Sequence, residues 1–435
     1  MKLSSEVLSA KLAGEIGASS VESNPGALTS YAIDGKVPSL RCLPSTPEQA
    51  RSILRICSEA QAAVIPWGGG TSMKLGNVPR QADVVVGLER LDKLVEHDDA
   101  NLTATIQAGM RVASFQRMVG ERRQFLAIDP PHPARATVGG IVAANVNGPR
   151  RMAYGGLRDL VIGMKIVLAT GEQIKTGGKV VKNVAGYDLC KLFVGSLGTL
   201  GIITEVTFRM APLPESAASV VAWGPLAQSL QMVDELSRSP LLPEAITVLN
   251  ADAAKATGNG SGMPVIALWA EGFEENVTRH LHDLQAMAEV IGLTSEILRG
   301  ETHRRLWEEI RDFGMNGQAV LYRLTVPLAS VAEVVRTVEQ WSTSEKRVRY
   351  ITHAGTGTLW VSADADPAGM GWFPRLTALA QSRRGHAVIT AAPAELKGNI
   401  DVWGQAPPSL NLMREIKRQF DPQGILNPGR FLAHL

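Results

Sequence analysis

The feature that most constrains this chain is a triple glycine that directly follows a short apolar run. Residues 62–65 predict a buried strand, and residues 66–72 then read Pro-Trp-Gly-Gly-Gly-Thr-Ser. Residues without Cβ atoms can adopt positive φ angles and turn several backbone N–H groups toward one point, which suits an anion such as a pyrophosphate. The same pattern is also typical of a tight turn that binds nothing, so this stretch alone leaves both interpretations open.

Composition and charge exclude several classes of protein. The chain has 435 residues, enough for two or three domains with substantial cores. A hydrophobic content of 45%, a charged content of 20% and 42 glycines indicate a soluble protein of helices and strands that is rich in tight turns. The formal net charge is +2 and no basic run interleaved with aromatic residues occurs, so neither nucleic acid nor an anionic membrane is predicted as a partner.

Cysteine usage and the N-terminus bear on the compartment. The three cysteines, Cys42, Cys57 and Cys190, show no Cys-x-x-Cys spacing, so no disulfide framework, zinc site or iron–sulfur cluster is predicted. The N-terminal stretch lacks the continuous apolar core of a signal peptide, and no run reaches the length of a membrane-spanning helix. We expect a cytoplasmic protein, with any contact at the inner face of the cell membrane made through a partner.

A second glycine cluster lies in residues 129–148, DPPHPARATVGGIVAANVNG. Thr137 can cap a helix whose first turn carries Gly139 and Gly140, and glycine inside a helix costs stability unless something approaches the backbone closely. The simplest explanation is a second approach of bare backbone to the same ligand.

A third cluster places Gly195, Gly198 and Gly201 before a predicted strand at 202–208. This spacing is not the Gly-x-Gly-x-x-Gly of a dinucleotide-binding turn, and no Gly-Lys-Ser/Thr occurs, so a Rossmann dehydrogenase or an ATPase is poorly supported.

The pattern changes after a predicted linker at 211–214. Short strands and amphipathic helices alternate beyond it, which predicts a separate α+β cap domain. The predicted strands are 245–249, 265–270, 319–326, 348–353 and 358–362, and the predicted helices are 230–236, 277–291, 302–313 and 331–341. A helix beginning at Ser409 and the segment 421–430, DPQGILNPGR, end the chain.

These segments together resemble the flavin-binding oxidoreductases of the vanillyl-alcohol-oxidase type, and within them the FAD-linked 2-hydroxy-acid dehydrogenases. The matching motifs are 66–72, 129–148, 195–204 and 421–430, in the family's order. The resemblance implies an α+β fold: a PCMH-type FAD-binding domain of two α+β subdomains at 1–212, an α+β cap domain at 213–400, and a C-terminal segment at 401–435 that returns to the flavin.

The family's cofactor residues carry over position by position. The resemblance implies that the first glycine loop holds the FAD pyrophosphate, that the second cluster lines the flavin and ribityl path, and that Gly198 and Gly201 let the chain pass the cofactor. It also implies that the backbone of Ile203 meets the adenine side and that Asn427 and Arg430 return toward the isoalloxazine edge. The residues implied to bind FAD are Pro66, Trp67, Gly68, Gly69, Gly70, Thr71, Ser72, Pro130, Thr137, Val138, Gly139, Gly140, Ala143, Gly148, Gly155, Gly198, Gly201, Ile202, Ile203, Asn427 and Arg430. Because the first loop holds no histidine of the kind that often attaches flavin, FAD is expected to bind non-covalently.

The cap departs from the pattern of catalytic relatives, which carry His-x-Gly-Asp-Gly-Asn-x-His and a later Glu-His-Gly to hold a divalent metal. Residues 353–360 here keep His353, but threonines replace Asp and Asn, and Trp360 replaces the second histidine. No histidine occurs near 394–404, so no metal site is predicted. Arg311 and Arg323 match positions where relatives keep a cation for the substrate carboxylate, and both also suit structural roles. His353 suits a hydrogen-bonded core histidine better than a base.

The resemblance extends to function. Residues 182–209 are similar to FAD-binding subunits of bacterial glycolate oxidases, which implies a complex with a catalytic flavoprotein subunit and an iron–sulfur subunit. In such a complex this chain would relay electrons from the oxidation of glycolate to glyoxylate. Two alternatives stay open. One is an independent FAD enzyme that oxidises a small 2-hydroxy acid with Arg311, Arg323 and His353, and the other is a non-catalytic scaffold.

Overall fold

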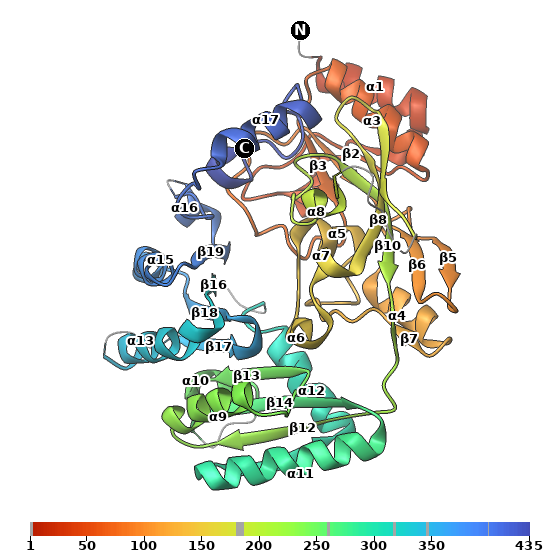
Figure 1. Ribbon diagram of the computed structural model, residues 1–435. Coiled ribbons are helices and arrows are strands. Elements are labelled where there is room, and N and C mark those ends of the chain that lie inside the picture. Colours follow the sequence, from red (N-terminus) through yellow and green to blue (C-terminus); the bar gives the residue numbers. More distant parts are fainter. Residues whose placement is uncertain (1–2, 180–186, 259–261, 316–318, 345–347, 399) are drawn as a thin grey trace.

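The computed structural model describes residues 3–179, 187–258, 262–315, 319–344, 348–398 and 400–435. Residues 182–186, the start of the 182–209 similarity, therefore lie outside the described residues. Buried side chains form one large hydrophobic core from residues 8–210 together with Ile425 and Leu426, and further cores within 218–402. In Figure 1 the N-terminal part lies at the top and the green and cyan cap lies below it.

The first sheet carries the triple-glycine loop. Its order is β1 (Val21–Glu22), β2 (Leu40–Cys42), β4 (Val84–Gly87) and β3 (Val64–Trp67), with β2 and β3 both parallel to β4. The helices α1 (Ser5–Ile16) and α3 (Pro47–Glu59) contribute apolar side chains to the same core. Side chains fix the start of α3, because the Thr46 hydroxyl accepts from Gln49 N at 3.3 Å and Gln49 Oε1 accepts from the Ser45 N–H.

The second sheet of the N-terminal part is antiparallel. Its order is β5 (Leu94–Asp98), β6 (Thr103–Gln107), β10 (Ile202–Arg209), β8 (Val161–Val167) and β9 (Gln173–Gly177). The helices α4 (Val112–Gly120) and α5 (Val138–Ala144) bury their apolar residues against it. Part of the predicted linker is instead a strand, since β11 (Ala211–Pro212) pairs with β7 (Gln124–Phe125).

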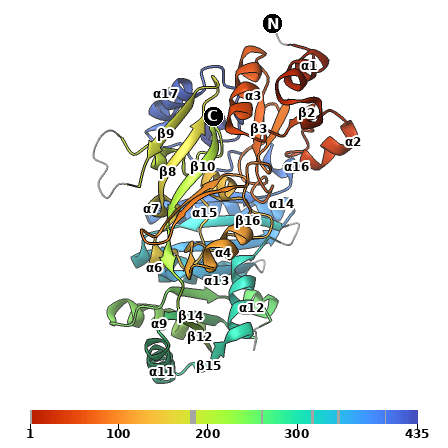
Figure 2. The same cartoon turned by 90° about the vertical axis from the view of Figure 1, so that its right-hand side faces the viewer.

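The cap is an eight-stranded antiparallel sheet. Its order is β15 (Thr294–Arg299), β12 (Ser216–Trp223), β14 (Val265–Gly272), β13 (Ala245–Leu249), β17 (Arg349–His353), β18 (Thr358–Asp364), β16 (Ala319–Thr325) and β19 (His386–Ala391). The predicted cap strands are present, whereas β12, β15 and β19 had not been predicted. Figure 2 shows the same sheet lying below the N-terminal part.

Helices cover both faces of the cap sheet. One core gathers residues of α9 (Leu226–Arg238), α11 (Glu274–Ile291), α13 (Val331–Ser344) and α15 (Trp372–Ser382) against one face. A smaller core places α10 (Ala251–Ala256) and α12 (Gly300–Arg311) on the other face. The rest of that second face turns toward the N-terminal part, where α6 (Arg151–Tyr154) contacts β13 and η4 (Ala354–Thr356).

The C-terminal segment returns to the first sheet. After α16 (Ala394–Lys397) and α17 (Leu410–Phe420), Val64 N donates to Ile425 O at 2.8 Å and Asn427 N donates to Val64 O at 2.9 Å. Lys417 fixes the turn by donating to Thr199 O and Leu426 O and by pairing with Asp421 at 2.6 Å. Figure 1 accordingly shows the blue C-terminus beside the red and orange N-terminal elements.

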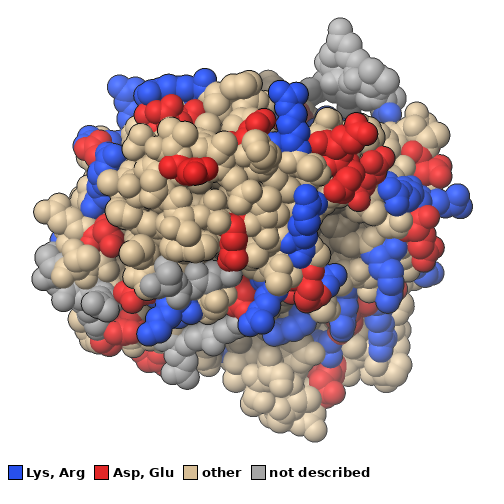
Figure 3. All heavy atoms as spheres, turned by 90° about the horizontal axis from the view of Figure 1, so that it is seen from below, with Lys and Arg blue, Asp and Glu red and all other residues tan. Residues whose placement is uncertain are grey.

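Two surface properties complete the description. Basic and acidic side chains are interspersed over the face shown in Figure 3. Across the described ranges, no helix combines the length and apolar character needed to cross a bilayer.

Candidate functional site

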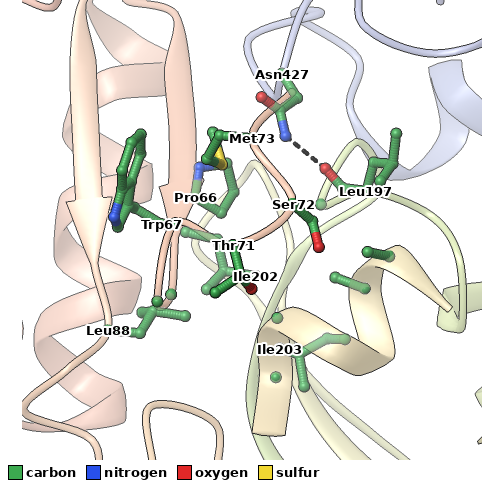
Figure 4. A pocket seen from close by; sticks show the side chains of 18 of the residues that line it. Pro66, Trp67, Thr71, Ser72, Met73, Leu88, Leu197, Ile202, Ile203 and Asn427 are labelled. Atoms are coloured by element: carbon green, nitrogen blue, oxygen red, sulfur yellow. Dashed lines mark hydrogen bonds between the residues drawn. The ribbon is translucent and has the colours of Figure 1, made fainter. Parts of the chain in front are cut away.

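An open cavity lies where β3 and β4 end, between the two N-terminal sheets. Four stretches of chain far apart in the sequence line it: 66–75 with Leu88, the helix α5, residues 197–203, and the C-terminal segment. Figure 4 shows Thr71 and Ser72, Ile203 and Asn427 around one space.

Glycine in the first loop is required by packing. A Cβ at Gly69 would overlap the carbonyl of Arg135, and one at Gly68 would overlap the hydroxyl of Thr137, which caps α5 and accepts from Gly140 N at 3.3 Å. The loop therefore lies directly on the start of α5. Gly139 has a similar cause, because its Cβ would come 2.6 Å from the Ala108 side chain. The close approach expected at Gly139 is thus made by this chain's own strand end.

Two buried polar atoms at the cavity have no partner. Asn427, which has a positive φ of 44°, donates its amide to Leu197 O, yet its Oδ1 atom has no hydrogen-bond partner among the described residues. The Nε atom of Arg430 is also buried and has no hydrogen-bond partner among the described residues. Leaving such atoms buried and unpaired costs about 1–3 kcal/mol each, so the cavity suits a polar ligand that could satisfy them.

Most residues predicted to bind the cofactor come together at this cavity. The predicted residues that line it are Pro66, Trp67, Gly68, Gly69, Gly70, Thr71, Ser72, Gly139, Gly140, Ala143, Gly198, Gly201, Ile202, Ile203, Asn427 and Arg430. The remaining five, Pro130, Thr137, Val138, Gly148 and Gly155, are outside its lining. Their role in binding stays a prediction.

Some lining residues were not predicted: Met73, Leu75, Leu88, Ala144 and Leu197. Met73 and Leu75 continue the first loop. Leu88 was detectable in principle, since it follows β4, a strand parallel to β3, and the carboxyl ends of parallel strands meet at one sheet edge.

His353 is a buried core residue. Its Nδ1 atom lies 3.0 Å from the Thr247 hydroxyl, the side chain is 7% exposed, and burial lowers its pKa to about 4. The following residues are bonded to one another, because Thr356 Oγ1 donates to His353 O and lies 3.2 Å from Thr358 Oγ1. A Cβ at Gly355 would overlap the sulfur of Met152, so η4 packs tightly against α6.

The two predicted carboxylate-binding arginines have different surroundings. Arg311 forms a bidentate pair with Asp312 at 3.0 and 2.8 Å, and Asp312 also accepts from His132 N. Arg323 lies on β16, on the same sheet face as His353 and 5.8 Å from the Trp360 ring centre. Its Nε atom has no partner among the described residues, and burial together with the charge of Arg151 lowers its pKa. Arg311 is therefore occupied, whereas Arg323 keeps a free donor.

Within the described ranges, no three His, Cys, Asp or Glu side chains gather as a metal site would require.

An ion cluster that the sequence did not reveal joins the two parts of the chain. Arg150 pairs with Asp129 at 2.6 Å and with Glu271 of the cap at 3.3 Å, and its guanidinium lies over the rings of Phe125 and Trp269. Tyr154 also donates to Glu271, at 2.6 Å. No local pattern marks this cluster, because Glu271 lies 121 positions after Arg150 and 117 positions after Tyr154.

Comparison with known proteins decides the family. Residues 38–177 match the FAD binding domain family, and residues 405–431 match the C-terminal domain of FAD linked oxidases. Glycolate oxidase subunit GlcD of Bacillus subtilis is 30% identical over 95% of this chain and 93% of its own length. The chain belongs to the FAD-linked oxidase and dehydrogenase family. A D-lactate dehydrogenase of Anaerostipes hadrus is 28% identical, with 93% and 92% covered, and a bovine mitochondrial D-2-hydroxyglutarate dehydrogenase is 27% identical, with 89% and 76% covered.

Solved structures show the same fold. p-Cresol methylhydroxylase with substrate bound superposes with a TM-score of 0.75 at 17% identity, covering 98% of this chain and 96% of that one. An alkyldihydroxyacetonephosphate synthase gives 0.75 at 16% identity, covering 97% and 85%. The predicted α+β, PCMH-type fold is confirmed.

FAD is accordingly the cofactor of this FAD-linked oxidoreductase. Of the described residues that line the cavity, none is a histidine, cysteine or tyrosine to which flavin could be attached, in agreement with non-covalent binding. The unpartnered atoms of Asn427 and Arg430 and the bare backbone of the glycine loops fit a phosphate-bearing, polar cofactor.

Proposed function

We propose that this chain is the FAD-binding, E-type subunit of a glycolate oxidase complex. The observation that carries the proposal is that residues 353–360 pack closely and form hydrogen bonds within the chain. His353 is neutral at physiological pH and bonded to Thr247, and no metal-ligand group accompanies it among the described residues. This supports a chain that keeps the cofactor and has lost the metal-assisted substrate site. The similarity to glycolate oxidase subunit GlcD of B. subtilis supports a glycolate oxidase subunit and does not favour the E type over the D type.

The proposed role is electron relay. In the complex, glycolate loses two electrons and two protons to become glyoxylate on a catalytic flavoprotein subunit. Bound FAD supplies an acceptor that takes up two electrons and can release them singly. An iron–sulfur subunit then carries the electrons toward a membrane quinone, so contact with the inner face of the membrane is made through partners.

The proposal includes an assignment of the cavity. The loop 68–72 holds the pyrophosphate, α5 lines the ribityl side, residues 198–203 border the adenine side, and Asn427 and Arg430 close the pocket from the C-terminus. The residues outside the lining, with Pro130, Gly148 and Gly155 among them, continue the path toward the isoalloxazine. We keep the domain boundaries at 212/213 and 400/401 as part of the same proposal.

The test separates cofactor binding from substrate oxidation. The chain is expressed alone, reconstituted with FAD, and assayed for glycolate-dependent reduction of a dye acceptor, and it is then assayed together with its co-purifying subunits. We expect a yellow protein that turns over glycolate only in the complex. Full turnover by the chain alone would overturn this division of labour.

A second candidate function has one observation in its favour. Arg323 keeps a buried, unpartnered donor on the sheet face that bears His353. A guanidinium in that state can bind a carboxylate, which suits an independent FAD enzyme for a small 2-hydroxy acid. Arg323→Met then abolishes substrate-dependent bleaching of bound flavin in the isolated chain while FAD remains bound. A wild-type chain that shows no bleaching with any 2-hydroxy acid contradicts this candidate.

A further inference from the structure

Four successive carbonyls behind the glycine loop are bound by two buried cations. Arg430 Nη2 donates to Met73 O at 2.7 Å and also to Leu75 O. Lys397 Nζ donates to Lys74 O at 2.7 Å and to Gly76 O at 3.3 Å. The two cations therefore bind alternate carbonyls of residues 73–76, although one comes from α16 of the cap and the other from the C-terminal segment.

Further contacts fix the end of the same stretch, at Gly76 and Asn77. Gly76 has a φ of 103° and lies so close to the chain that a Cβ would come 2.7 Å from Arg430 O. Asn77 N and the Trp403 indole N–H both donate to Arg430 O at 3.0 Å, and the Asn77 amide donates to Asp401. Residues 73–77 thus have a fixed backbone without any contribution from a ligand.

Charge does not balance at these cations. The Lys397 side chain is fully buried, and its one acidic partner among the described residues is Asp34, at 3.0 Å, whose side chain is 6% exposed. Arg430 is 3% exposed and forms no ion pair among the described residues. Asp401 accepts from Asn77, Trp403 N and Ala433 N. Lys397, Arg430 and Asp34 together carry one excess positive charge, and Arg430 lines the cavity.

Lys397 must be protonated to make these contacts. Its Nζ atom donates in three directions, to Asp34, Lys74 O and Gly76 O, and only the ammonium form has three hydrogens. Burial lowers the pKa of Arg430 to about 10, which still leaves the guanidinium charged at neutral pH.

We propose that Lys397, Arg430 and Asp34 form a two-cation clasp whose excess positive charge stabilises the diphosphate group of the cofactor. Lys397 acts as a positioning residue that does not line the cavity. The inference rests on the proposed placement of the FAD pyrophosphate at residues 68–72. Buried charge is screened weakly, so an unbalanced cation beside the loop favours a dianionic group in it.

Variants that change the charge of the clasp test the proposal, because those that lower and those that raise the charge are expected to differ in their effect on FAD affinity. Lys397→Met removes the excess charge, Asp34→Asn raises it, and the double variant Asp34→Asn/Lys397→Met restores it without leaving a lone buried carboxylate. We expect the Kd for FAD to rise on the order of tenfold in Lys397→Met, to return close to wild type in the double variant, and to stay equal or fall in Asp34→Asn. Flavin fluorescence quenching measures binding, and thermal unfolding of the apo-protein confirms that each variant folds.

Two partial ligands provide the control, one without the flavin and one without phosphate. ADP carries the diphosphate without the flavin and should show the same order of affinities, whereas riboflavin should bind all four proteins alike. A double variant that binds FAD as weakly as Lys397→Met, or a riboflavin affinity that changes in parallel, overturns the clasp. If wild-type protein binds FAD but ADP affinity is equal in all variants, the clasp fails while the proposed function stands. If wild-type protein binds no FAD, the proposed function itself fails.

Discussion

The two regions that the sequence marked as functional are built in opposite ways. The cavity between the N-terminal sheets is open, is lined in part by glycine backbone, and leaves Asn427 Oδ1 and Arg430 Nε buried without partners among the described residues. The segment around His353 is closed, because its imidazole binds Thr247 and its glycine packs on Met152. The unpaired atoms of the first region suit a polar ligand. In the second region His353 and Thr356 bond within the chain, and Arg323 Nε lacks a partner among the described residues. The contrast supports our proposal that this chain keeps the cofactor site and has lost the metal-assisted substrate site.

The largest effect is expected at the open region. Gly69→Val places a branched side chain against the Arg135 carbonyl, which belongs to the backbone and cannot move aside cheaply. We expect FAD binding to fall more than 100-fold and stability to drop by about 3 kcal/mol. The visible spectrum of the purified protein and thermal unfolding measure the two effects. Gly178→Ala, where a Cβ meets nothing within 4 Å, is the matched control and should bind FAD normally.

The contact between the N-terminal part and the cap should be at least as sensitive in stability, but without an effect on cofactor binding. Arg150→Met leaves the carboxylates of Asp129 and Glu271 without their shared cation, and breaking a buried pair in this way typically costs about 3–5 kcal/mol. Chemical denaturation measures the loss. If folded Arg150→Met still binds FAD with wild-type affinity, the cofactor site does not depend on this contact with the cap. A cofactor affinity that falls in step with stability would contradict that independence.

Acid should destabilise the closed region through His353. Its folded pKa of about 4 lies below the ordinary value of 6.5, because burial disfavours the charged ring. A depressed histidine pKa means that its contribution to stability is complete above pH 6.5 and is lost as pH falls from 6.5 toward 4, by about 3 kcal/mol at most. His353→Gln should flatten the dependence of unfolding free energy on pH in this window. An unchanged slope would show that His353 is not buried in the neutral form.

The smallest effect is expected at Arg311. It is paired with the adjacent Asp312 near the surface, and such pairs contribute about 0–1 kcal/mol. Arg311→Ala should leave both FAD affinity and any substrate-dependent bleaching of flavin unchanged, as stopped-flow absorbance can establish. A loss of bleaching with FAD still bound would instead support the independent-enzyme candidate and make the cap face a working substrate site.

The sequence predicted local features well and long-range contacts poorly. Thr137 caps α5 as expected, because a cap depends on a residue three positions away. The strand β12 was not predicted, since its small residues 216–219 read as irregular chain until β14 and β15 pair with it. Lys397 was noticed only as part of a stretch without histidine. Its partners Asp34 and Lys74 are more than 300 positions away, and no local spacing can reveal such a contact.

The reason given for the glycines also changed. Gly68, Gly69, Gly139 and Gly201 border the cavity, yet each is already explained by close packing, because an added Cβ would overlap atoms of this chain. An added Cβ at Gly140 meets only the Thr137 hydroxyl, at 3.0 Å. A glycine cluster in sequence therefore indicates close approach of backbone, but it does not by itself distinguish a ligand from the chain's own atoms.

The most direct test of the contrast is one anaerobic titration of the isolated, FAD-loaded chain with glycolate, followed at the flavin absorbance band. The account predicts a yellow protein whose flavin stays oxidised until the catalytic partner subunit is added. Complete bleaching of the flavin by glycolate in the absence of any partner would contradict it.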